Sequence, residues 1–187
     1  MLEVEVKAHI YGDMPEITAR AESRGYEFCG TLKEHDRYFY LMDGGTAKKD
    51  TALRIRRQVC DGVESVFMAY KGPLESERIN TREEIEFEVG SAHRAEAFLL
   101  ALGHERALDV HKVRRYYVGG MITVAFDTLE GIGHFREIET LIKDAEDRKA
   151  AEDRLLEELD ALLPGAVPER RTYLQMLMEQ QKREETP

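Results

Sequence analysis

The chain of 187 residues carries 37 acidic and 27 basic side chains, a formal net charge of -10 at pH 7. This balance argues against a general nucleic-acid binder but leaves room for a local basic site. With 42% hydrophobic and 34% charged residues, the composition excludes wholesale disorder, and the length allows a sizeable core. No run reaches the roughly 18 apolar residues of a membrane span, and the N-terminus lacks a signal-peptide pattern. We therefore expect a cytoplasmic protein that binds neither nucleic acid nor membrane, with Cys29 and Cys60 as ordinary thiols.

Alternation of apolar and polar residues with a period of two predicts eight strands. They cover about residues 2–10, 33–41, 52–60, 64–71, 82–89, 107–118, 121–127 and 134–142. Asp61-Gly62 and Gly119-Gly120 are typical of tight hairpin turns, so we expect an antiparallel sheet.

Four helices are expected to accompany these strands. The first begins at Asp13 and stops at Gly25, and the second runs from a Ser91 cap to Gly103. Two more follow the last strand, over about 145–163 and 172–182, and an apolar side on them would allow a homodimer. Without a repeat or a Ser/Gly-rich linker, the sequence predicts one α+β domain over 1–187. Its strands lie in about 2–142 and its C-terminal helices in about 145–182, and the helices decorate a barrel or strongly curled sheet.

Long charged side chains share one face of most predicted strands. In the first strand, Glu3, Glu5 and Lys7 lie on one face and apolar residues on the other. The acids on such faces are Glu3, Glu5, Glu84, Glu86, Asp127, Glu137 and Glu139, and the bases are Lys7, Arg54, Arg56, Lys71, Arg82, Lys112 and Arg114. One strand of this kind normally faces water, but eight strands largely sorted by sign indicate two partners of opposite charge. Carboxylates are ligands for Mg²⁺ or Mn²⁺, and the bases are donors for phosphate oxygens, so metal plus polyphosphate suits both sets.

The segment Glu3-Val4-Glu5-Val6-Lys7 resembles the ExExK signature of the CYTH, or triphosphate tunnel metalloenzyme, superfamily. The motifs that follow in the family's order are Leu53-Arg54-Ile55-Arg56, Lys71-Gly72-Pro73, Arg82 with Glu84 and Glu86, Lys112-Val113-Arg114, Asp127, and Glu137-Ile138-Glu139. The resemblance implies a closed eight-stranded antiparallel β-barrel, a triphosphate tunnel decorated with helices. Three further motifs look most like the class IV adenylyl cyclase branch: Lys71-Gly72-Pro73, Gly131-Ile132-Gly133 and Arg171-Thr172-Tyr173.

The resemblance also implies roles for individual residues. Glu3, Glu5, Asp127 and Glu137 would hold one or two Mg²⁺ or Mn²⁺ ions, with Glu139 and Glu86 as further candidates. The substrate-binding bases would be Lys7, Arg54, Arg56, Lys71, Arg82, Lys112 and Arg114, of which Lys7, Arg56 and Lys71 are expected to be catalytic. A cyclase would convert ATP to cyclic AMP and pyrophosphate.

Two other functions remain open at this stage. The same residues could hydrolyse tripolyphosphate, thiamine triphosphate or another triphosphate. A non-catalytic phosphate-binding module is the third reading, and the complete set of acids argues against it, because a pure phosphate binder gains less from a row of metal ligands.

Three groups of residues outside these motifs could also contribute to binding or catalysis. Three histidines, His35, His111 and His134, could carry protons. They show no ligand spacing, so we expect surface or structural roles for them. Four residues of the second strand could contact a nucleobase or phosphate: Asp36, Arg37, Tyr38 and Tyr40. For Tyr38 and Tyr40, packing within the sheet is the alternative. The segment 43–50 is expected to be a solvated turn, with a lid over the substrate as the alternative.

Overall fold

A computed structural model, described here over residues 1–184, contains eight long strands whose hydrogen bonds close an antiparallel barrel. The strand order around the barrel is β1-β10-β9-β8-β2-β5-β6-β7. The strands are β1 (Leu2–His9), β2 (Glu27–Tyr40), β5 (Ala52–Cys60), β6 (Val63–Lys71), β7 (Asn80–Glu88), β8 (Glu105–Gly119), β9 (Ile122–Leu129) and β10 (Gly133–Ile142). The predicted α+β fold with a closed eight-stranded barrel is confirmed.

Helices form where the sequence predicts them. They are α1 (Met14–Ser23), α2 (Ala92–Ala101), α3 (Arg148–Leu162) and α4 (Tyr173–Glu184), and a 3₁₀ turn, η1 (Ala145–Asp147), precedes α3. The Ser91 hydroxyl accepts a hydrogen bond from the backbone N–H of Arg94 and so caps α2, as its position predicts. In the described part of the chain, no helix has the length and apolar character needed to span a bilayer.

The structure differs from the prediction at two places: the start of the second strand, and the segment that follows this strand. β2 begins at Glu27, earlier than the predicted residue 33, because Gly30 interrupts the alternation that would have revealed its first half. The segment 43–50, expected to be a solvated turn or lid, contains part of a small hairpin of β3 (Met42–Asp43) and β4 (Thr46–Ala47). Its turn residues Gly44 and Gly45 have φ of 57° and 84°, values that glycine adopts without strain.

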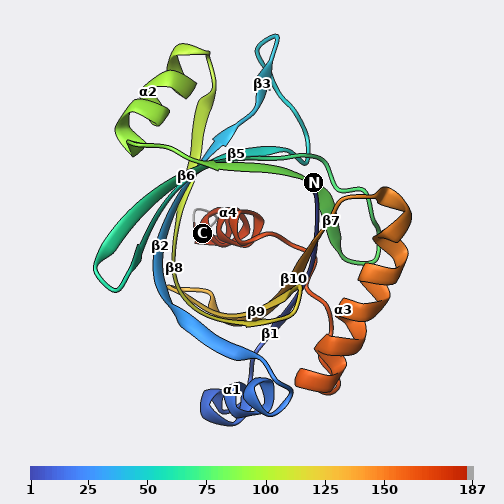
Figure 1. The fold of residues 1–187 in the computed structure, drawn as a ribbon. Coiled ribbons are helices and arrows are strands. Elements are labelled where there is room, and N and C mark those ends of the chain that lie inside the picture. Colours follow the sequence, from blue (N-terminus) through green and yellow to red (C-terminus); the bar gives the residue numbers. More distant parts are fainter. Residues whose placement is uncertain (185–187) are drawn as a thin grey trace. The chain divides into compact units, whose positions relative to one another are not determined.

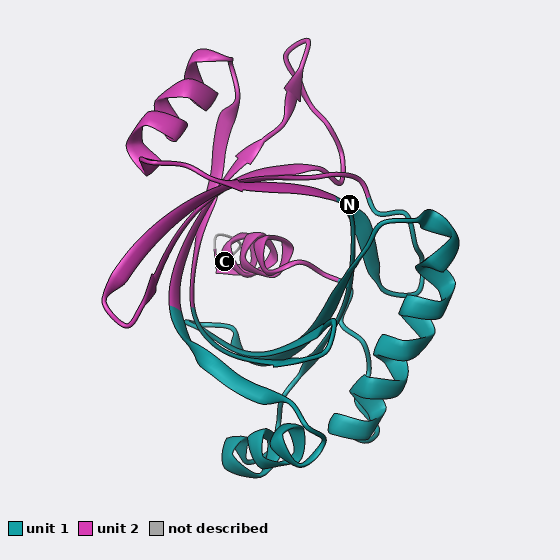
Figure 2. Cartoon of the chain, viewed as in Figure 1, with its two compact units in different colours: residues 1–32, 74–83, 113–170 teal, residues 33–73, 84–112, 171–187 magenta. Residues whose placement is uncertain are grey.

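The chain forms two compact units, shown in separate colours in Figure 2. Unit 1 comprises residues 1–32, 74–83 and 113–170, and unit 2 comprises 33–73, 84–112 and 171–187. The strands β2, β7 and β8 each contribute residues to both units. The single domain over 1–187 stays a prediction.

In unit 1, the apolar faces of β1, β9 and β10 pack against two helices (Figure 1). Val6 and Ile138 are 1% and 0% exposed in the same cluster as Ile17 of α1 and Leu155 of α3. Side chains alternate along a strand, so Glu5, Lys7 and the other charged residues of these strands point to the opposite face. That face is the inner one of the closed sheet.

The strands of unit 2 also have one apolar face covered by a helix, here α2, and one charged face. Phe39 of β2, Ile55 of β5 and Val66 of β6 form a buried cluster with Ala95 and Leu99 of α2 (Figure 1). The charged residues that alternate with them therefore lie on the face turned away from α2. In both units, the helix-covered apolar face fixes which side chains occupy the other face of the sheet.

Candidate functional site

Three carboxylates of unit 1 lie close together on this inner face. Glu3 and Glu5 come from β1 and Glu139 from β10, and Glu5 is paired directly with Glu139 in the strand register. One oxygen of each carboxylate lies within 4.8 Å of the others. Burial, together with the neighbouring Glu3, Glu137 and Glu5, raises the pKa of Glu139 to about 8, against an opposing effect of Arg114. Three acids held this close repel one another, which is the arrangement that a cation would relieve.

The Glu139 carboxyl gives a prediction for stability against pH. In the unfolded chain its pKa is 4.5, and in the folded protein it is about 8. A raised carboxyl pKa destabilises the fold increasingly as pH rises from 4.5 towards 8. Glu139→Gln, which cannot ionise, should therefore raise the melting temperature of the metal-free protein by roughly 5 °C at pH 8 and leave it nearly unchanged at pH 4. Thermal unfolding followed by circular dichroism at both pH values checks this, and an equal shift at both would contradict it.

Arg114 of β8 holds the other two predicted metal ligands. Its Nε and Nη2 donate to Oδ1 and Oδ2 of Asp127 at 2.7 and 2.6 Å, and Nη2 also contacts Glu137. Asp127 and Glu137 are 0% and 4% exposed, so this network is buried. Arg114, predicted to bind phosphate, thus neutralises residues predicted to bind metal.

Lys7 lies beside both acidic groups of unit 1. Its Nζ is 3.4 Å from Oε1 of Glu5 and 3.4 Å from Oε1 of Glu137. Burial lowers the pKa of Lys7, but the two carboxylates outweigh it and hold the pKa above the ordinary 10.5. Lys7 therefore remains protonated at neutral pH and acts as a fixed positive charge rather than as a base.

Arg82 of β7 differs from the other predicted phosphate-binding residues. It is 6% exposed and lies opposite Glu3 in the register of β7 with β1. Among residues 1–184, its guanidinium makes no ion pair within 4.0 Å, whereas the other six predicted bases all do. A buried guanidinium without a carboxylate is costly, and an anionic ligand would offset that cost.

In unit 2, Asp36 of β2 is the centre of the basic cluster. It is 0% exposed, and its two oxygens accept from Nε and Nη2 of Arg56 at 2.6 and 2.7 Å. Lys112 Nζ donates to Asp36 Oδ2 at 3.1 Å, and Arg54 Nη1 is 3.9 Å from the same oxygen. Burial alone would raise the pKa of Asp36, but Arg56 and Lys112 hold it well below its usual range.

The remaining predicted residues of unit 2 form a second ion-paired group. Lys71 Nζ is 2.7 Å from Oε2 of Glu84, and Arg54 Nη2 is 3.3 Å from Oε1 of the same carboxylate. Arg54 Nη2 also donates to Oε2 of Glu86 at 2.5 Å, so Glu86, a candidate metal ligand, is bound to an arginine. Lys112 Nζ additionally lies 5.6 Å from the ring centroid of Tyr173 in α4.

The sequence did not identify Glu34 as part of this network, and it did not predict that Asp36 forms ion pairs. Glu34 is 4% exposed, and its Oε2 lies 2.6 Å from Lys112 Nζ and 3.3 Å from Arg56 Nη2. Asp36 was expected only as a contact for nucleobase or phosphate. The alternation of Glu34, Asp36 and Tyr38 along β2 is the signal that could have placed both acids on the same face as the bases.

Comparison with known proteins adds the family. The CYTH domain family matches residues 1–173 of this chain. A protein named "Putative adenylate cyclase MJ0240" from Methanocaldococcus jannaschii is 32% identical over 162 residues, which cover 87% of this chain and 90% of that protein. The structure of protein PH1819 from Pyrococcus horikoshii superimposes with a TM-score of 0.83 at 35% identity, covering 95% of this chain and 99% of the other.

A more distant solved structure shares the fold. It is the Hippeastrum protein "Putative adenylyl cyclase HpAC1", described as having a dominant triphosphatase activity. The TM-score is 0.62 at 15% identity, over 96% of this chain and 95% of the other.

Proposed function

We propose, because this chain belongs to the CYTH family of triphosphate-processing enzymes, that it converts ATP to cyclic AMP and pyrophosphate with the help of Mg²⁺ or Mn²⁺. The observation that carries the proposal is the compact carboxylate group of Glu3, Glu5 and Glu139, with Lys7 protonated beside Glu5. A phosphate binder without metal would have no use for three mutually repelling acids. The name of the relative from M. jannaschii supports cyclisation as the reaction.

The donor set of unit 1 fits a hard divalent cation. Carboxylate oxygens are the ligands that Mg²⁺ and Mn²⁺ prefer. Burial and the neighbouring acids raise the pKa of Glu139, so ionisation of this carboxyl is costly, and a bound cation would offset that cost. We assign Glu3, Glu5 and Glu139 to this site, with Asp127 and Glu137 as ligands that Arg114 and Lys7 must first release. When bound, the metal would lower the pKa of the attacking hydroxyl and balance charge on the leaving oxygens.

The lysines and arginines predicted from the sequence to bind phosphate are the proposed phosphate donors. Arg54, Arg56 and Arg114 can offer forked N–H pairs to phosphate oxygens, and Lys7, Lys71 and Lys112 act as point charges. These bases are paired with carboxylates in the structure, so triphosphate oxygens would replace carboxylate oxygens as acceptors. This exchange keeps each of these six bases paired, with and without ligand.

In the proposed reaction, the ribose 3′-oxygen attacks the α-phosphorus in line, the α–β phosphoanhydride bond breaks, and the hydroxyl proton leaves to solvent. Lys7 remains protonated, so its role is to stabilise negative charge on the α-phosphate oxygens. Arg56 and Lys71 would stabilise the charge that develops on the leaving pyrophosphate.

Hydrolysis of tripolyphosphate, thiamine triphosphate or another triphosphate is the second candidate. It needs the same carboxylates and bases, with water in place of the 3′-hydroxyl, and the activity described for the Hippeastrum protein favours it. Purified protein incubated with ATP, tripolyphosphate or thiamine triphosphate, under Mg²⁺ or Mn²⁺, distinguishes the two by product chromatography. Formation of cyclic AMP with pyrophosphate would support cyclisation. Formation of orthophosphate would support hydrolysis in its place. No turnover of any of the three substrates would contradict both functions.

Arg82 gives a binding prediction that does not depend on which bond breaks. Arg82→Met removes a buried charge that has no ion-pair partner in the described chain, so the ligand-free protein should keep or raise its melting temperature. Its affinity for tripolyphosphate should fall about 10- to 100-fold, the loss expected for charge-assisted hydrogen bonds. Calorimetric titration measures the affinity. Arg115→Met, on an exposed arginine that alternates with Arg114 along β8, is the control and should bind normally. Unchanged affinity in Arg82→Met would remove this residue from the site.

A further inference from the structure

Two histidines of unit 2 stack on the outer face of the barrel. His35 lies on β2 and His111 on β8, two strands that are neighbours in the sheet. Their ring centroids are 4.2 Å apart with an interplanar angle of 16°. Each is adjacent in sequence to a residue of the basic cluster, Asp36 or Lys112, so alternation turns the histidines to the opposite face. They are therefore not part of the proposed triphosphate site.

A carboxylate completes the group. Asp109 precedes His111 by two residues on β8, which places both side chains on one face. Its Oδ2 lies 2.8 Å from Nε2 of His35. One nitrogen of each histidine and one oxygen of Asp109 all lie within 4.8 Å of one another. The three residues are partly exposed, so an ion in solution can reach them.

Arg37 holds the Asp109 carboxylate in a fixed orientation. Its Nε and Nη2 donate to Oδ1 and Oδ2 at 3.1 and 3.0 Å, while Nη1 donates to Glu96 at 2.7 Å. Each carboxylate oxygen has two lone pairs, so Arg37 leaves acceptor capacity on Oδ2, where His35 now contacts it. The charge of Arg37 is shared with Glu96, which limits its repulsion of a cation bound beside Asp109.

These ligand types select a different metal from the inner carboxylates. Two imidazoles and one carboxylate suit Zn²⁺ and its neighbours Ni²⁺ and Cu²⁺, whereas Mg²⁺ prefers oxygen ligands alone. We propose that His35, Asp109 and His111 form a transition-metal site that binds Zn²⁺ independently of the proposed catalytic metal. The ion would replace the hydrogen bond between His35 Nε2 and Asp109 Oδ2, with small rotations of the two rings.

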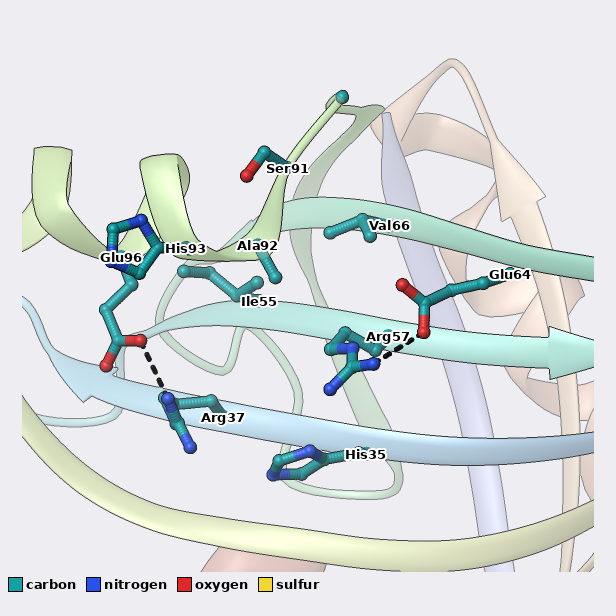
Figure 3. Close-up of a pocket in the computed structure, with 11 residues that line it drawn as sticks. His35, Arg37, Ile55, Arg57, Glu64, Val66, Ser91, Ala92, His93 and Glu96 are labelled. Carbon is teal, nitrogen blue, oxygen red and sulfur yellow. Dashed lines mark hydrogen bonds and ion pairs between the residues drawn. The ribbon is translucent and has the colours of Figure 1, made fainter.

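The surroundings leave room for water to complete the coordination shell. His35 and Arg37 line a cavity of about 490 Å³ between the outer face of β2, β5 and β6 and the N-terminal end of α2 (Figure 3). His93 of α2 lines the same cavity but is not within ligand distance of the group. It is therefore a matched control: an exposed histidine of the same region that the site does not use.

Zinc titration of the whole chain tests the proposal. Isothermal titration with ZnCl₂ is run in millimolar Mg²⁺, which occupies the inner carboxylates, on the wild type, His35→Ala, His111→Ala and His93→Ala. The expected result is one Zn²⁺ per wild-type chain, with affinity lowered at least about tenfold in His35→Ala and His111→Ala and unchanged in His93→Ala. Circular dichroism of the metal-free variants establishes that they fold. If an alanine variant does not fold, His35→Gln and His111→Gln keep the side-chain volume.

Electron paramagnetic resonance with Cu²⁺ provides a second readout. The wild-type spectrum should show hyperfine splitting from two nitrogens, and each single variant should lose one. Absence of zinc binding by the wild type, equal affinity in the histidine variants, or a copper spectrum without nitrogen splitting would each overturn the site.

Discussion

Glu5→Ala should abolish metal-dependent turnover while the protein stays folded. Glu5 belongs to the carboxylate group with Glu3 and Glu139, and its Oε1 also accepts hydrogen bonds from Asn80 and Lys7, at 3.2 and 3.4 Å. Loss of one carboxylate from the proposed metal site removes several kcal/mol of transition-state stabilisation, which corresponds to a fall in kcat of about 10³-fold. Removing a negative charge from a repelling group should at the same time leave thermal stability intact.

The measurement is steady-state turnover of the substrate that the product assay identifies, at saturating Mg²⁺ and Mn²⁺, together with the melting temperature. Glu83→Ala is the control, because Glu83 is exposed and alternates with Arg82 on the strand next to Glu5. It should retain normal turnover. Full activity in Glu5→Ala would remove Glu5 from the metal site.

Arg56→Ala should lower both stability and triphosphate binding. The substitution leaves the fully buried Asp36 without its forked partner, although Lys112 at 3.1 Å keeps part of the compensation. Breaking a buried ion pair by removing one partner costs about 3–5 kcal/mol, which for a chain of this size lowers the melting temperature by roughly 10 °C. The affinity for tripolyphosphate should fall as well, because a proposed donor to phosphate is lost.

A second substitution separates these two effects. In Asp36→Asn/Arg56→Ala, the buried charge disappears with its partner, so much of the stability should return while binding stays weak. Arg56→Lys keeps the charge without the fork and should bind with intermediate affinity. Thermal unfolding and calorimetric titration measure the two quantities. A double variant that binds as tightly as the wild type would show that Arg56 acts only on the fold.

The sequence predicts which face of each strand is charged because that information is local. Alternation over β1, such as Val4 and Val6 against Glu5 and Lys7, survives in the structure with the apolar residues under α1 and α3. Turn chemistry is local too: Asp61 and Gly62 both have positive φ, at 49° and 81°, in the predicted tight turn between β5 and β6. Such features need no knowledge of which strands become neighbours.

The partners of each charge could not be predicted, since they come from strands distant in sequence. Arg56 and Lys112 meet at Asp36, although they lie on different strands from it and from each other. The stacking of His35 with His111 likewise depends on β2 lying beside β8, which no local pattern reveals. Period-two alternation identifies a face, and only the strand order identifies neighbours on that face.

The pairing of Arg114 and Lys7 with Asp127, Glu137 and Glu5 has a thermodynamic consequence. If a cation bound to these acids without a polyanion, Arg114 and Lys7 would lose their ion-pair partners. If a polyanion bound to the two bases without a cation, the acids would lose theirs. The polyanion would neutralise the bases that the cation displaces, and the cation would neutralise the acids that the polyanion displaces. Binding of either proposed ligand should therefore raise the affinity for the other. A triphosphate already chelated to its metal ion would deliver both charges in one encounter, and is then the species that the proposed site would accept most readily.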